Sequence, residues 1–198
     1  RSMAEIAGTV PATFVFYRGD HEQPKDKVLP GALSILGEGP TIAENDPALP
    51  SSGRRLAFAK HLTSGKHPLV ARVIANRIWM HHFGRGLVDS PGDFGVLGQQ
   101  PTHPELLDWL VSEFVDNGWS VKHLHRLIMT STVYQQSSKS KSPVASDDSQ
   151  PSFYSAFPVR RLESEVIRDA VLAVTGQLNQ KLYGEAVPVM EDGVGRVV

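Results

Sequence analysis

Apolar side chains recur at helical spacing over most of the chain beyond Ser51, and this period is what most constrains the fold. One face of a helix repeats at that spacing, whereas a half-buried strand alternates at every second residue. The pattern predicts helices over about residues 53–63, 67–83, 102–117, 120–133 and 159–178. The expected fold is therefore mainly α, with a helical bundle-like body.

Residues that begin and end helices lie between these segments. Ser, Thr and Pro are favoured at helix starts, and glycine is favoured just past helix ends because it tolerates a left-handed conformation. The expected starts are Ser51 or Ser52, Pro68, the capping box Thr102-His-Pro-Glu105, and Ser120. The expected stops are Gly84 and Gly86 after the second helix and Gly118 after the third.

The apolar stripe of each predicted helix is expected to point inward. In the first helix the inward residues are Leu56, Phe58, Ala59 and Leu62. In the fourth they are Val121, Leu124, Leu127 and Ile128, and in the last they are Leu162, Val166, Ile167, Ala170, Val171 and Val174. We interpret Trp79, Trp109 and Trp119 as core anchors rather than as an exposed platform for carbohydrate.

The first fifty residues differ from the rest, because they hold six of the fourteen prolines and show little helical period. Thr13–Tyr17 is β-branched and aromatic, which predicts a short strand. Residues 1–50 are therefore expected to form an extended, Pro-rich N-terminal arm, and residues 51–198 a helical domain. Residues 137–152 are predicted to be a loop. Residues 184–198 end without a stop signal, so we expect the helical domain to be truncated at its C-terminus.

The net charge of −1 selects no class of partner, but the charges are unevenly placed. Between Ser51 and Val88 there are seven Lys and Arg residues and no acid, and between Asp89 and Asn117 there are six acids and no Lys or Arg. These segments can pack together and neutralise each other. The alternative is a basic face that binds an anion.

The composition excludes several classes of chemistry. The chain has no cysteine, so it offers no disulfide, no catalytic thiolate and no Cys-ligated zinc, iron–sulfur cluster or c-type haem attachment. No cofactor is therefore expected in this chain. No apolar run is long enough for a membrane span. The two helices around Gly118-Trp119-Ser120 superficially match a helix-turn-helix, but the domain is near-neutral and the second of these helices offers few basic side chains, so nucleic-acid binding is not expected.

The residues best suited to chemistry are concentrated between Asn76 and Phe94 and at the following helix start. Arginine and histidine can bind anions, and histidine and aspartate can bind metals or move protons. The candidate ligand-binding residues are Arg77, His81, His82, Arg85, Asp93 and His103. The same residues could instead form a helix end and its turn, with Asp93 bonding backbone amides as a turn-former.

No recognised catalytic motif accompanies these candidates. There is no Gly-x-Ser-x-Gly sequence and no His-x-x-x-His or His-Glu-x-x-His sequence. His81 and His82 are adjacent on a predicted helix, so their side chains diverge and cannot readily share one metal. A binding module and a metal-assisted hydrolase that uses a His/Asp cluster both stay open, and no catalytic or metal-ligating residue is assigned.

A long series of motifs resembles one family, the planctomycete-type PSD-one domain, a domain of unknown function. The motifs are Arg54-Arg-Leu-Ala, Asn76-Arg-Ile-Trp, His81-His-Phe-Gly-Arg-Gly-Leu-Val, Asp93-Phe-Gly, Pro101-Thr-His-Pro-Glu-Leu-Leu-Asp-Trp-Leu, Gly118-Trp-Ser-Val-Lys, Leu127-Ile-Met-Thr-Ser, Tyr134 and Arg161-Leu-Glu-Ser-Glu-Val-Ile-Arg-Asp-Ala. They keep the same order over nearly the whole chain.

The resemblance implies the kind of protein in which the domain occurs rather than a reaction that it catalyses. Such domains are similar to the C-terminal parts of large exported bacterial proteins, which often carry a cytochrome-c-like haem domain and sometimes a carbohydrate-associated module. The resemblance therefore implies an extracytoplasmic accessory or binding module whose partners are other, haem-bearing domains of the parent protein, with a glycan or an anion as a further ligand. It carries over no catalytic residue.

Overall fold

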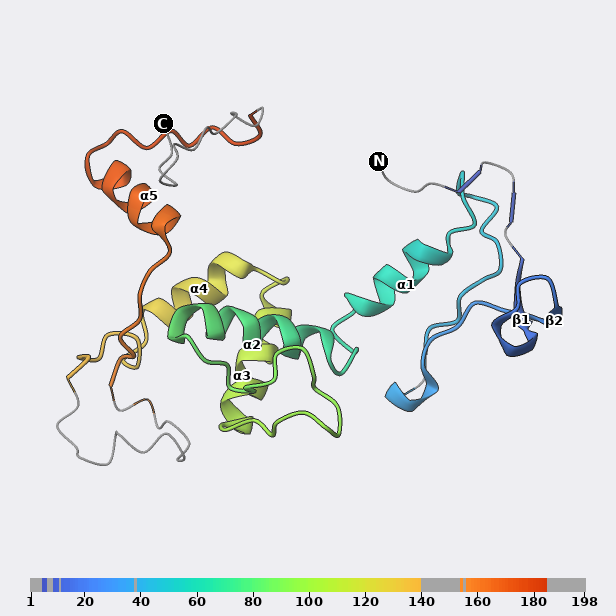
Figure 1. Ribbon diagram of the computed structural model, residues 1–198, viewed down its shortest axis with the longest axis horizontal. Helices are drawn as coiled ribbons and strands as arrows, with labels where there is room; N and C mark the ends of the chain where they lie inside the picture. The colour runs from blue at the N-terminus through green and yellow to red at the C-terminus, as the bar shows by residue number, and fades with distance from the viewer. Residues whose placement is uncertain are drawn as a thin grey trace, which may run out of the picture. The chain divides into compact units, whose positions relative to one another are not determined.

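The computed structural model describes residues 5–6, 9–10, 12–37, 39–139, 154 and 156–184 (Figure 1). Helices dominate these residues, and the two short strands form one antiparallel pair. The mainly α fold with short β segments is therefore confirmed. The chain divides into two compact units, Arg1–Pro158 and Val159–Val198, and each is described by itself.

The arm of the first unit begins with a small hairpin. Strand β1, Thr13–Phe16, pairs with β2, Pro24–Val28, in the register Thr13↔Val28 and Phe14↔Lys27. The 3-10 turn η1, Tyr17–Gly19, follows β1, and a second one, η2, spans Ser34–Leu36 further along the arm. The predicted strand at Thr13–Tyr17 is confirmed, whereas β2 was missed because Pro24-Lys-Asp-Lys-Val28 is too charged to read as a strand.

Helix α1, Arg54–Leu62, lies where the first helix was predicted but begins differently. Its N-cap is Gly53, in a left-handed conformation with φ 76°. Ser52 is buried, and both its amide and its hydroxyl donate to the Glu5 carboxylate, at 2.7 and 2.9 Å. The prediction that Ser51 or Ser52 caps α1 is therefore wrong, because Ser52 bonds Glu5 near the N-terminus instead.

The prediction of which residues of α1 point inward is also wrong. Leu56, Phe58 and Ala59 are exposed, and only Leu62 is partly covered. The helix packing centres on α2, α3 and α4 instead. An apolar stripe shows which face of a helix can be buried, but it does not supply the surface that buries it.

The core lies between α2, Val70–Phe83, α3, Pro104–Asp116, and α4, Val121–Met129. Two residues of the loop after α2 complete it. The buried apolar residues are Ala71, Ala75, Trp79, Phe83, Leu87, Val88, Leu107, Leu110, Phe114, Leu124 and Ile128. Trp79 and Trp119 pack in or against this core as expected, but Trp109 is half exposed, so its assignment as a core anchor is wrong.

Helix α2 ends as predicted and begins later than predicted. Gly84, with φ 81°, closes it, and its amide donates to the Met80 carbonyl at 2.7 Å. Pro68 lies before the helix rather than in its first turn. The His67 side chain caps the start, because its Nδ1 accepts from the amides of Leu69 and Val70, each at 3.3 Å.

Removing this cap has a measurable expected cost. We expect His67→Ala to lower the free energy of unfolding by about 1 kcal/mol, because two amides lose their acceptor. His67→Asn keeps a side-chain acceptor and should recover most of the loss. Urea unfolding measures both, with the exposed neighbour Lys66→Ala as control. Equal stability of His67→Ala and the parent chain would contradict the cap.

The capping box predicted at Thr102–Glu105 does not form. The N-cap of α3 is His103, and both the amide and the hydroxyl of Thr102 donate to the Leu87 carbonyl, at 2.8 and 3.2 Å. Ser120 does cap α4, since its Oγ accepts from the His123 amide at 3.2 Å. Helix α4 is shorter than predicted and Val121 is exposed, so its inward assignment is wrong.

The second unit contains α5, Ser164–Val174, which begins after the predicted position 159. None of its residues is buried in the structure, and Val174 is among the most exposed, so the predicted inward face has no described partner. The predicted loop from residue 140 to 152 and the tail beyond Gly184 lie outside the described residues. Across the described ranges, each helix is too short or too polar to span a bilayer.

Candidate functional site

The loop after α2 is held to that helix by one buried side chain. Asn76 is 0% exposed, and its Nδ2 donates to the Val88 carbonyl at 2.9 Å while the Val88 amide donates to its Oδ1 at 2.8 Å. Gly86 packs so closely that a Cβ there would lie 2.4 Å from the Val88 oxygen. Gly86 therefore permits a close approach of the loop, beyond the predicted role of ending α2.

The second half of the loop is a bonded turn that ends in an apolar tip. Ser90 Oγ donates to the Asp93 carbonyl at 2.7 Å and accepts from the Gln99 amide at 2.8 Å. Asp93 Oδ1 accepts from the Gly95 amide at 2.8 Å, and the Gly98 amide donates to the Gly95 carbonyl at 3.0 Å. At the tip, two aliphatic side chains lie in solvent: Val96 is 100% exposed and Leu97 is 93% exposed.

An aromatic cluster surrounds Phe83 at the end of α2. Its ring centroid lies 4.3 Å from Trp79, 5.3 Å from Tyr154 and 5.9 Å from Tyr134 and Phe157. Trp79 Nε1 donates to the Tyr154 hydroxyl at 2.8 Å. Burial raises the pKa of the Tyr154 phenol above its usual value, so this group stays a neutral hydrogen-bonding partner.

Two histidines meet at the edge of this cluster. His82 Nε2 of α2 lies 2.7 Å from His125 Nδ1 of α4, and the ring centroids are 5.0 Å apart. The His82 ring also contacts Tyr134 edge-on at 5.5 Å. His103 lies on the Tyr154 side, with its ring centroid 5.5 Å from that phenol ring and its Nδ1 2.9 Å from Thr102 Oγ1.

The six candidate residues are only partly brought together by these contacts. His82 and His103 both border the aromatic cluster, and Arg85 is near enough to Tyr154 to affect its phenol electrostatically. The Asp93 carboxylate bonds within its own turn. Arg77 and His81 are exposed on α2, and Arg85 lies past the end of that helix, so the three do not share one helical face.

The uneven charges described above meet in two ion pairs. Arg72 of α2 pairs with Asp108 of α3, and Arg85 pairs with Asp89 at 3.2 Å. Helices α2 and α3 also pack directly. These contacts favour neutralisation between the basic and acidic segments, although exposed pairs of this kind stabilise the fold by only ~0.2–1 kcal/mol each.

Four residues of this region were not among the candidates: Asn76, His125, Tyr134 and Tyr154. Asn76 occupies an otherwise apolar stripe between Ala75 and Trp79, and a polar residue there is a signal of a buried hydrogen bond. His125 follows the core residue Leu124 and lies one turn from Ile128, which places it beside the core. Nothing in the sequence signals Tyr154, which lies 75 residues from its partner Trp79.

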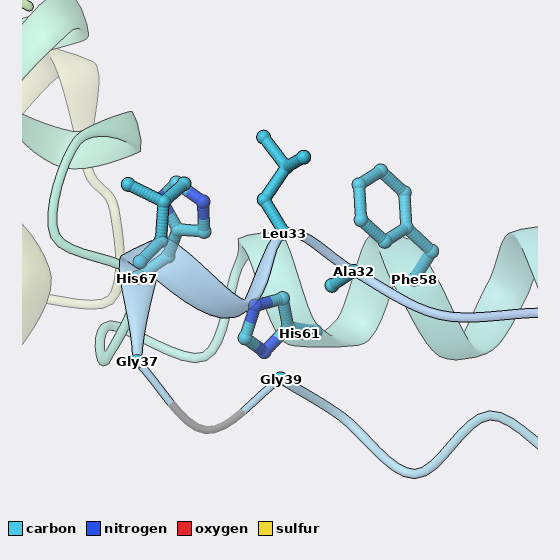
Figure 2. A pocket seen from close by; sticks show the side chains of 8 residues that line it. Ala32, Leu33, Gly37, Gly39, Phe58, His61 and His67 are labelled. Atoms are coloured by element: carbon cyan, nitrogen blue, oxygen red, sulfur yellow. The ribbon is translucent and has the colours of Figure 1, made fainter.

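Two further hollows lie on the described residues, and the larger, of about 220 Å³, is lined by arm residues that include Asn45, Asp46 and Leu49. Figure 2 shows a cleft of about 70 Å³ lined by Leu33 of the arm and by Phe58 and His61 of α1, with His67 beside them. Small-molecule sites usually occupy roughly 300–1,000 Å³, so this cleft admits little more than a side chain. Within the described ranges, no three His, Asp or Glu side chains are grouped closely enough to hold a metal ion together.

Comparison with known proteins identifies the family. The family model PSD1, described as a protein of unknown function (DUF1553), matches residues 54–195, from the start of α1 onward. No curated protein and no solved structure matches the chain. Because the matched residues make up well over half of the sequence, the chain belongs to the PSD1 family of proteins of unknown function.

Proposed function

We propose that this domain is a non-catalytic accessory module that binds another domain of a large exported bacterial protein, in a system associated with cytochrome-c-like haem domains or polysaccharide processing. The observation that carries the proposal is the bonded loop that holds Val96 and Leu97 in solvent. Two adjacent aliphatic side chains on one turn gain free energy when a partner covers them.

The loop has the properties of a prepared binding element. The hydrogen bonds of Ser90 and Asp93 hold the turn in one conformation. A Cβ at Gly98 would lie 2.2 Å from the Asp93 carbonyl oxygen, so the backbone at Gly98 packs directly against the backbone at Asp93. A rigid element loses less conformational entropy on binding than a flexible one. Exposed Asp93, Gln99 and Gln100 flank the apolar tip in sequence, and an interface usually has a polar rim around its apolar centre.

Two exposed polar side chains on α2 extend this proposal to a polar ligand. Arg77 and His81 are one helical turn apart and both are exposed. They can meet an anionic group or a glycan hydroxyl on the same partner. The alternative, a metal-assisted hydrolase, needs Asp93 to act together with the histidines, and the bond that Asp93 Oδ1 accepts from the Gly95 amide favours a turn role for Asp93 instead.

The experiment is a binding measurement with the remainder of the parent protein. We expect the double variant Val96→Ser/Leu97→Ser to raise the Kd at least about thirtyfold, which corresponds to ~2 kcal/mol for a pair of central interface side chains. Isothermal titration calorimetry measures the Kd, and circular dichroism checks that the variant is folded.

The matched control is Ile35→Ser, which removes a side chain that is 89% exposed on the arm. It should leave the Kd unchanged. An unchanged Kd for the loop variant would overturn the proposed binding surface. Loss of binding in both variants would mean that exposed apolar area in general, rather than this loop, drives association.

A further inference from the structure

The contact between His82 and His125 joins two elements that are far apart in sequence. The residues are 43 positions apart, one in the last turn of α2 and one in α4. Both side chains are half-buried, and the His82 ring packs against Tyr134. The two nitrogens that face each other are the kinds of atom that bind transition metals in proteins.

The spacing of the two rings is close to that of two histidines on one tetrahedral metal. With metal–nitrogen bonds of about 2.05 Å, two imidazoles at the tetrahedral angle place their nitrogens about 3.3 Å apart and their ring centroids about 5.2 Å apart. The observed values are 2.7 Å for the nitrogens and 5.0 Å for the centroids. To bind a metal, both rings must rotate so that their nitrogens point at the ion instead of at each other, whereas the spacing of the ring centroids already fits and needs almost no movement of the helices.

The surrounding packing holds one of the rings in place. The His82 ring lies edge-on against Tyr134, with an interplanar angle of 83°. Tyr134 itself contacts Phe83 and Phe157. A ligand ring held by such contacts loses less rotational freedom on binding a metal, because its orientation is already set.

We propose that His82 and His125 form a two-histidine site for a divalent first-row transition metal such as Zn²⁺, Ni²⁺ or Cu²⁺, which links α2 to α4. Imidazole nitrogen suits these ions and not Mg²⁺ or Ca²⁺, which take oxygen ligands. Water completes the coordination. With two protein ligands the site binds more weakly than a structural zinc site, which has four.

The site goes beyond the proposed binding function and does not depend on it. It lies at the edge of the aromatic cluster, whereas the proposed binding surface is the loop tip at Val96 and Leu97. A metal that binds the native state and not the unfolded state stabilises the fold, so its expected effect is on stability first.

The test is a titration of the untagged chain with Zn²⁺ and Ni²⁺, read by calorimetry and by the midpoint of thermal unfolding. We expect one ion per chain and an unfolding midpoint that rises with metal concentration. His82→Gln and His125→Gln should each raise the Kd about tenfold or more and remove the rise in the midpoint. Glutamine keeps a hydrogen-bonding group at each position, and circular dichroism confirms that each variant is folded.

The chain supplies matched controls on the same two helices. His81→Gln removes the exposed neighbour of His82, and His123→Gln removes a histidine of α4 that lies 3.2 Å from the Glu113 carboxylate. Both should leave the Kd unchanged. The proposal is overturned if the parent chain binds neither ion, if His82→Gln and His125→Gln bind as the parent does, or if binding is lost instead in His61→Gln, whose ring lies 5.5 Å from His67.

Discussion

Asn76→Leu is expected to lower the free energy of unfolding by about 3 kcal/mol. Leucine has the same branching and the same number of side-chain heavy atoms but cannot bond the Val88 amide or carbonyl, which Asn76 pairs at 2.8 and 2.9 Å. Both backbone groups lie at a residue that is almost fully buried, so water cannot replace the lost partners. A buried polar group without a partner costs about 1–3 kcal/mol, and this variant leaves two.

Urea unfolding measures the loss, and amide hydrogen exchange locates it. The Val88 amide should exchange much faster in Asn76→Leu, because its acceptor is gone. The matched control is Asn117→Leu, since Asn117 also bonds a backbone carbonyl, that of Glu113 at 2.8 Å, but at an exposed position. It should change stability by less than about 0.5 kcal/mol. Equal effects at the two positions would contradict the importance of the buried contact.

The helices of this domain were largely predictable, and their environments were not. The apolar period and the glycines at Gly84 and Gly118 predicted where α2 and α3 end, since those signals act within one turn of the chain. Where a helix starts depends on which of several hydrogen-bond partners a capping side chain bonds. Ser52 and Thr102 both have a hydroxyl suited to a cap, but each bonds a distant group instead, Glu5 in one case and Leu87 in the other. Such tertiary competition is invisible in a local pattern.

The candidate site was predictable as a region and not as a set of contacts. Residues 76–94 do form the junction of α2 with its bonded loop, as their composition indicated. The pairing of His82 with His125 and of Trp79 with Tyr154 depends on how helices and a distant segment pack. Spacing along one helix predicts which side chains share a face, but it does not predict which residue of another element lies opposite.

Gly86→Ala is expected to destabilise the domain by at least about 3 kcal/mol, because overpacking against a fixed backbone cannot be relieved by a rotamer change. The new Cβ would lie 2.4 Å from the Val88 carbonyl oxygen and 2.8 Å from both polar atoms of the Asn76 side chain. The loop must then move away from α2, and the two bonds between Asn76 and Val88 lengthen or break. Thermal or urea unfolding measures the loss.

Gly92→Ala is the matched control, because a Cβ there meets no atom within 4 Å and the same loop carries it. It should shift stability by no more than about 0.5 kcal/mol. A double-mutant cycle separates the causes: in an Asn76→Ala background two of the three close contacts of Gly86→Ala disappear. The two substitutions together should therefore cost less than the sum of their separate effects. Strict additivity would show that the backbone oxygen of Val88 alone excludes a side chain at position 86.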